Sequence, residues 1–99
     1  MPSYNAKPLP NQIRRYRKKH NLRLREVAQL VGLTSASHLS HWEKGRKLPK
    51  LKNALKLSAI IQCPVEILFS GLFNDIRHDV FIKKQSANNK LTKQPYDAR

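Results

Sequence analysis

Four small polar side chains lie within seven consecutive positions near the middle of the chain, and each can donate or accept hydrogen bonds. They are Ser35, Ser37, His38 and His41. If residues 35–44 form a helix, its period turns Leu39 and Trp42 toward the core and leaves both histidines and Ser37 outside. A small, polar and acid-free face of this kind suits a helix that reads base edges in the major groove of DNA.

Basic residues surround this segment in the sequence. We expect eight of them to contact phosphates: Arg14, Arg15, Arg23, Arg25, Lys44, Arg46, Lys47 and Lys50. Arg23 and Arg25 stand at the start of the preceding helix, where cations oppose the helix dipole. A bound phosphate reverses that penalty, because the free backbone N–H groups and the arginines then attract the same anion. Each neutralised phosphate adds roughly 0.9 to the salt dependence of binding, so six contacts predict a slope of about −5.

The composition also indicates an anionic partner. The 99 residues contain 20 lysines and arginines against 6 acids, for a net charge of +14, and 39% of the residues are hydrophobic. These numbers describe one small domain with a modest core. The charge is the electrostatic signature of a nucleic-acid binder. An unusually soluble surface, a peptide that lies on membranes and a ribosomal-type RNA binder are the alternatives that share it.

Other site chemistries are disfavoured. Cys63 is the single cysteine, which excludes an internal disulfide and a cysteine-based zinc site, and we expect it to fill the core. Asp75, His78 and Asp79 could ligate a metal, but an ordinary polar surface explains them more simply. No run approaches the ~20 apolar residues of a membrane span, and the N-terminus lacks a signal peptide. We therefore expect no metal, no cofactor, no enzymatic activity, and a cytoplasmic protein associated with the nucleoid.

Apolar spacing predicts an all-α chain. The expected helices cover residues 11–20, 24–31, 35–44 and 51–62, followed by a short helix that Ser70 and Gly71 terminate. Asn11 is expected to cap the first helix, Thr34 or Ser35 the third, and Leu51 and Leu55 to lie on the apolar face of the fourth. We divide the chain into a flexible N-terminal arm (1–10), a DNA-binding helix-turn-helix domain (11–71), a C-terminal helix (72–84) and a disordered basic tail (85–99).

Residues 11–69 resemble the Cro/repressor-type (XRE) helix-turn-helix family, the lambda-repressor-like DNA-binding domain. The matching motifs occur in the family's order: Arg17–Leu22, Val27–Ala28, the turn glycine Gly32, and the Glu-x-Gly-x-x-x-Pro run Glu43–Pro49. The resemblance implies a five-helix bundle, with an additional C-terminal helix here, whose third helix enters the major groove. It also implies an ion pair between Glu43 and Arg17. The residues expected to act structurally are Arg17, Glu43, Trp42 and Gly45.

The sequence departs from the family's pattern in two places. At the start of the second helix the family usually has Thr or Ser followed by Gln, and here we expect an arginine charge to substitute for the glutamine. Between Gly32 and Glu43 lies one residue more than the common spacing. If the family's spacing is aligned backward from Glu43, the groove-facing residues are Ser37, His38 and His41, with Ser35 or Ala36 at the helix start. If it is aligned forward from Gly32, each groove-facing position shifts by one residue. Periodicity favours the backward alignment, because it buries Leu39 and Trp42.

These features predict a sequence-specific, repressor-like transcriptional regulator of bacterial or phage origin that binds double-stranded DNA. One helix in one groove reads few base pairs, so we expect a homodimer on a pseudo-palindromic operator, with half-sites about one turn (~34 Å) apart. The apolar repeat Leu72, Phe73, Ile76 and Val80 would either close the bundle or join two copies. Two alternatives are an antitoxin whose residues 72–99 order on a toxin partner, and a structural RNA-binding protein.

Overall fold

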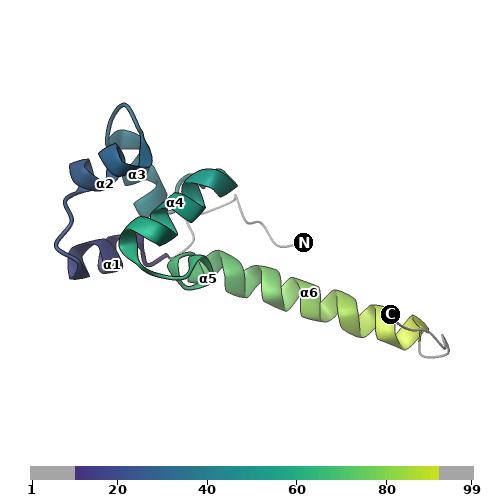
Figure 1. Ribbon diagram of the computed structural model, residues 1–99. Helices are drawn as coiled ribbons and strands as arrows, with labels where there is room; N and C mark the ends of the chain where they lie inside the picture. Colours follow the sequence, from purple (N-terminus) through teal and green to yellow (C-terminus); the bar gives the residue numbers. More distant parts are fainter. Residues whose placement is uncertain (1–10, 92–99) are drawn as a thin grey trace.

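The computed structural model describes residues 11–91, with side chains through residue 88, and every regular element in this range is a helix. The helices are α1 (Ile13–Lys19), α2 (Leu24–Val31), α3 (Ser37–Glu43), α4 (Leu51–Ile61), α5 (Val65–Leu68) and α6 (Ser70–Leu91). The first five gather at one end, whereas α6 extends away from them (Figure 1), and the longest dimension is 55 Å against 28 and 23 Å. The prediction of an all-α five-helix bundle with an additional C-terminal helix is confirmed. The expected flexibility of residues 1–10 and 92–99 concerns segments outside the described residues.

The core lies between the five short helices, because each of them has one apolar side. α1 and α2 both pack against α3 and α4, and α4 packs against α5. The largest fully buried side chains are Ile13, Val27, Leu39, Leu57, Ile61 and Leu68. Cys63 is buried with them, as predicted. The Gln12 N–H donates to the Leu68 carbonyl at 2.7 Å and joins the start of α1 to α5.

The apolar face of α4 differs from the prediction. Leu57 lies in the core with Ala54 and Ile61, whereas Leu51 and Leu55 are 72% and 51% exposed. A helix presents one side to the core, so the burial of Leu57 turns Leu55, two positions earlier, outward. Leu51 is the first residue of α4 and lies at the edge of the bundle. Both leucines are therefore surface residues.

The C-terminal helix is longer than predicted in both directions. Ser70 and Gly71 begin α6 instead of ending α5, so the expected domain boundary at residue 71 falls inside a helix. The predicted disorder from residue 85 is wrong for residues 85–91, which continue α6 to Leu91. Their polar sequence carries no packing signal, but adding residues to a helix that is already formed costs much less free energy than starting one. Even with this length, α6 is too polar to cross a membrane, and no other helix within residues 11–91 is long and apolar enough to do so.

Candidate nucleic-acid interface

A left-handed glycine links α2 to α3. Gly32 has a φ of +96°, a conformation that residues with a Cβ rarely adopt. The N–H groups of Gly32 and Leu33 donate to the Ala28 carbonyl at 3.1 and 2.9 Å and close the last turn of α2. Lys56 Nζ donates to the Val31 carbonyl at 3.0 Å and ties this corner to α4. These bonds fix the direction in which the chain leaves α2.

The third helix is shorter than predicted, because α3 runs from Ser37 to Glu43 and not over residues 35–44. Ser35 lies in the preceding turn, where its hydroxyl is 2.8 Å from the Ser37 hydroxyl and 3.4 Å from the Ser37 nitrogen. Ala36 occupies the cap position without a side-chain hydrogen bond, so the predicted cap at Thr34 or Ser35 is too early. Two residues of the predicted helix, Ser35 and Ala36, thus belong to the turn before α3.

The burial pattern of α3 separates an inner side from an outer one. Leu39 has no exposed surface, and Trp42 is 7% exposed. Ser37 and His38 are exposed, and His41 is half-buried. This pattern agrees with the alignment counted back from Glu43. The polar side chains that were selected from the sequence therefore lie on the outer side of α3, with Ser35 exposed just before it.

A buried ion pair holds α3 against α1. Arg17 Nε donates to Glu43 Oε2 at 2.5 Å, and Arg17 Nη2 donates to Glu43 Oε1 at 3.1 Å. Both side chains are more than nine-tenths buried, and Arg17 Nη1 also donates to the Leu22 carbonyl at 3.0 Å. The pair that the family resemblance implied is present. Nearby, Asn11 Nδ2 donates to the Trp42 carbonyl at 2.8 Å, a contact that no sequence pattern announces.

A second left-handed glycine ends α3. Gly45 has a φ of +72°, its N–H donates to the Trp42 carbonyl, and the Arg46 N–H donates to the His41 carbonyl, both at 3.0 Å. This bonding is the Schellman motif, which requires a residue that tolerates positive φ. The tight turn leaves Lys44, Arg46 and Lys47 exposed directly after α3.

A surface hollow of about 420 Å³ joins the start of α2 to the start of α3. Arg23, Arg25, Gln29 and Ala36 are among the residues that line it. The Glu26 carboxylate accepts a hydrogen bond from the Arg23 backbone N–H at 2.7 Å and so caps α2. Gln29 was not selected from the sequence. Its spacing of four residues from Arg25 is the signal that could have identified it.

The predicted phosphate-contacting cations are all exposed: Arg14, Arg15, Arg23, Arg25, Lys44, Arg46, Lys47 and Lys50. Within residues 11–88 the ion pairs are Arg17–Glu43 and Asp79–Lys83, so none of the eight is paired with an acid. Five of the eight flank the two ends of α3, and the other three belong to α1 and to the start of α4. Arg15 lies over the ring of Tyr16 on its own helix, 5.8 Å from the ring centre. Across this described part of the chain, no three His, Cys, Asp or Glu side chains form a metal-binding group.

A two-helix unit that exposes polar side chains between two groups of cations is the arrangement of a DNA-binding helix-turn-helix protein. Comparison with protein families matches residues 13–68 to the helix-turn-helix family, which is more than half of the chain. The chain therefore belongs to the helix-turn-helix family of the Cro/repressor (XRE) type, whose members are DNA-binding transcriptional regulators.

A solved structure shares the fold. It is the clp gene regulator ClgR from Corynebacterium glutamicum, with a TM-score of 0.54 and 19% sequence identity. The match covers 85% of this chain and 87% of that chain. Because this coverage is longer than residues 1–71, the shared fold extends into α6. None of the curated proteins matches the sequence.

Proposed function

We propose that this protein is a sequence-specific, repressor-like regulator that inserts α3 into the major groove of double-stranded DNA. The placement of α3 is the observation that carries the proposal. The Arg17–Glu43 pair and the buried Trp42 hold its inner side, while Ser37 and His38 face outward between cations at both ends. Side chains that reach base edges specify a sequence, and cations that reach phosphates position the protein.

The proposed base-reading residues are Ser35, Ser37, His38 and His41. Hydroxyls and imidazoles make single hydrogen bonds with bases, and the outward face of α3 has no Arg, Asn or Gln for a bidentate contact. Each base contact therefore discriminates modestly. His41 is half-buried, so packing restricts its rotamers and makes it the better positioned of the two histidines. The phosphate contacts come from the exposed cations, chiefly those at the two ends of α3.

We further propose that the protein acts as a homodimer on a pseudo-palindromic operator. α3 has only seven residues. At about 1.5 Å per residue it spans roughly 10 Å, which corresponds to about three base pairs. Two copies on half-sites about one helical turn (~34 Å) apart read enough sequence to define one operator. A regulator that acts in this way would be found with the nucleoid.

A second candidate function is the antitoxin of a toxin–antitoxin pair. The exposed apolar side chains of α6, which include Ile76 and Val80, favour it. In that case a toxin covers α6, and the helix-turn-helix domain autoregulates the operon. The chain expressed alone would then have an α6 that proteases cleave readily, and addition of the toxin would protect it.

The test of the proposed function is selection of genomic duplex fragments, followed by titration of the enriched site and of scrambled DNA at several salt concentrations. We expect an inverted repeat that binds at least ~10³-fold more tightly than the scrambled duplex. Equal affinity for every duplex, with all of the binding explained by the salt slope, would contradict a sequence-specific regulator. Duplex RNA of the same length is the control for the RNA-binding alternative, since its narrow major groove does not admit α3.

A further inference from the structure

Three exposed cations cover the side of α1 that faces away from the core. The buried residues of this helix are Ile13 and Arg17. At about 100° per residue, Arg15, Lys18 and Lys19 lie roughly 120–180° around α1 from the mean direction of those two, and all three are exposed. We call this set of three residues the α1 outer face. The proposed contacts with an operator use neither Lys18 nor Lys19.

The α1 outer face is turned away from the proposed DNA surface of α3. α1 packs against α3 through its inner side, where Arg17 bonds to Glu43. Two helices that pack through their inner sides direct their outer sides apart. Figure 1 shows α1 below α2 and α3 in the bundle. We therefore expect a duplex that α3 occupies to leave the α1 outer face in solvent.

The ring of Tyr16 restrains two of the three cations. Tyr16 is half-buried and packs against the core. The Arg15 guanidinium carbon and the Lys19 Nζ lie 5.8 and 5.6 Å from the centre of its ring. An aromatic face attracts cations at this distance, and side chains that are already restrained lose less entropy when they bind a ligand. The face is therefore better ordered than three independent surface cations would be.

No acid neutralises the α1 outer face. Within residues 11–88 the ion pairs are Arg17–Glu43 and Asp79–Lys83, so none of the three cations has an acidic partner. The first acid of the sequence is Glu26, in α2. Neighbouring cations without counter-charges repel one another, and a bound anion relieves that repulsion. The face therefore favours an anionic ligand.

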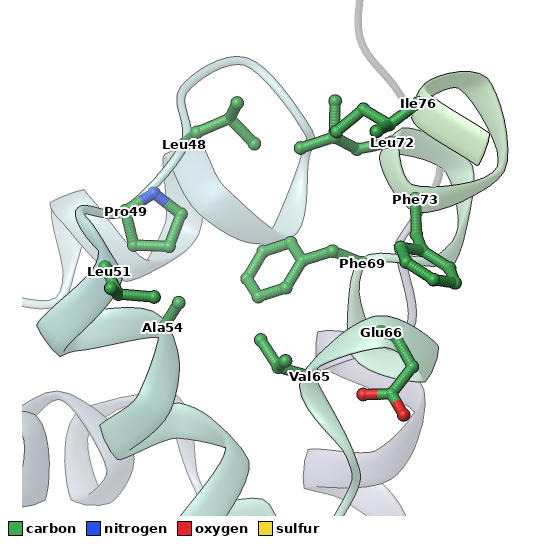
Figure 2. A pocket seen from close by; sticks show the side chains of 10 residues that line it. All are labelled: Leu48, Pro49, Leu51, Ala54, Val65, Glu66, Phe69, Leu72, Phe73 and Ile76. Atoms are coloured by element: carbon green, nitrogen blue, oxygen red, sulfur yellow. The ribbon is translucent and has the colours of Figure 1, made fainter. Parts of the chain in front are cut away.

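The character of the face favours nucleic-acid phosphates over a protein partner. The core of a protein interface is typically apolar and depleted of lysine. An apolar surface of that character lies elsewhere, in a groove of about 440 Å³ where Figure 2 shows Phe69 between Leu51 of α4 and Ile76 of α6. On α1, by contrast, every exposed side chain is cationic. Lysine and arginine without apolar neighbours suit a phosphate backbone.

We propose that the α1 outer face binds the phosphate backbone of a second nucleic-acid duplex, so that the protein holds two duplexes together. From Arg15 to Lys19 the face extends over about 6 Å at ~1.5 Å per residue, which is close to two ~3.4 Å steps between the phosphates of one strand. Each of the three cations can therefore meet a phosphate. Phosphate contacts carry no sequence information, so the second duplex can have any sequence.

This activity goes beyond the proposed function, in which α3 reads a single operator. It rests on that function only for the identity of the first duplex, because the contact with the second is measured separately. Two copies on one operator would present two such faces, and contacts made by both would hold the second duplex more tightly than either alone. A regulator with this surface would bring its operator close to distant DNA.

The first experiment measures how much of a fluorescent duplex is captured on beads that carry the selected site. The full chain is bound to the beads, and a fluorescent duplex of scrambled sequence is added at several salt concentrations. The double variant Lys18→Gln, Lys19→Gln should capture at least ~10-fold less than the wild type in ~0.1 M salt, because two of three phosphate contacts are lost. Titrated with the selected site alone, it should bind as tightly as the wild type.

Two further variants control for charge and for the chemistry of the face. Lys52→Gln, Lys84→Gln removes the same charge from exposed positions on α4 and α6 and should capture as the wild type does. Lys18→Arg, Lys19→Arg keeps both charges and should also capture the second duplex. Urea unfolding followed by Trp42 fluorescence reports whether each variant is folded.

Several outcomes would overturn the inference. A wild type that captures nothing would do so, as would equal capture by the two double glutamine variants, which indicates overall charge or the α3 helices of two chains. Weaker binding of the selected site alone by Lys18→Gln, Lys19→Gln would place these lysines on the operator. Polyglutamate that displaces the fluorescent duplex as well as unlabelled DNA does would assign the face to an acidic protein.

The same beads distinguish the source of the backbone and the two proposals. A fluorescent RNA duplex of equal length is tested beside the DNA, and preferential capture of either supports the inference and names its source. Capture that depends on Lys18 and Lys19 on beads carrying scrambled DNA, when no site can be selected, would support the inference and contradict the regulator function. A selected site without capture of a second duplex would do the reverse.

Discussion

Arg17 and Glu43, although 26 residues apart in sequence, share two hydrogen bonds that join α1 to the end of α3. The guanidinium uses its third contact on the Leu22 carbonyl, so it also fixes the loop that leads into α2. Both side chains are removed from water. The orientation of α3 therefore depends on a contact at its inner side, away from the proposed DNA surface.

Replacement of Glu43 by Gln should destabilise the domain strongly. The variant leaves the Arg17 guanidinium buried without its counter-charge, and removal of one partner from a buried pair typically costs about 3–5 kcal/mol. Urea unfolding followed by Trp42 fluorescence measures the loss. Asp79→Asn is the control, because it breaks the solvent-accessible pair with Lys83 and should cost less than ~0.5 kcal/mol. Similar losses in the two variants would show that Arg17–Glu43 contributes no more than a surface pair.

The turn after α3 should supply part of the salt dependence of DNA binding. In the double variant Arg46→Gln, Lys47→Gln two exposed cations are lost, so the slope of log affinity against log salt should fall by about 1.8 in magnitude. Affinity should decrease for operator and scrambled DNA alike. Lys84→Gln removes an exposed charge from α6 and should leave the slope unchanged. If all three positions change the slope equally, the protein binds through its overall charge and not through this turn.

The strongest predictions from sequence concerned backbone conformations that few residues can adopt. Gly32 and Gly45 were each expected to mark a turn, and both have positive φ, which residues with a Cβ rarely adopt. Leu39 and Trp42 were assigned to the core because their spacing of three leaves room for outward polar residues between them. These local constraints were sufficient to define the end of α2 and the side of α3 that faces outward.

Features set by packing between distant residues were not accessible in the same way. Leu51, Leu55 and Leu57 are chemically alike, and only the position of α4 against the other helices decides which leucine is buried. Gly71 can end one helix or lie in the first turn of the next, and the sequence around it does not distinguish these roles. The start of α3 was misplaced because the additional residue could lengthen either the turn or the helix. Gln29 was overlooked because its proximity to Ala36 arises from the turn between them.

His41 lies on the outer side of α3, where packing restrains it. It should contribute to the specificity of DNA binding without contributing to the stability of the fold. His41→Ala is expected to weaken binding to the selected operator by roughly five- to tenfold, the value of one hydrogen bond, and to leave scrambled-DNA affinity unchanged. His20→Ala is the matched control, because His20 is exposed at the end of α1. An equal loss of affinity for both duplexes would assign His41 to phosphate contact or to folding, and the unfolding midpoint separates those two outcomes.

The Cys63 thiol should be unreactive until the domain unfolds. Burial raises the pKa of Cys63, the charge of Glu66 raises it further, and Lys19 opposes both. The thiol also donates to the Pro64 carbonyl at 3.7 Å, a bond that only the protonated form can make. Alkylation at pH 8 should therefore be slow in buffer and rapid in urea.

Because the folded pKa is the higher one, the thiol stabilises the fold fully below the unfolded value of about 8.5, and this contribution is lost as the pH rises through the folded pKa. Unfolding free energies of wild type and Cys63→Ala should thus converge at alkaline pH, and a constant difference between them would contradict the raised pKa.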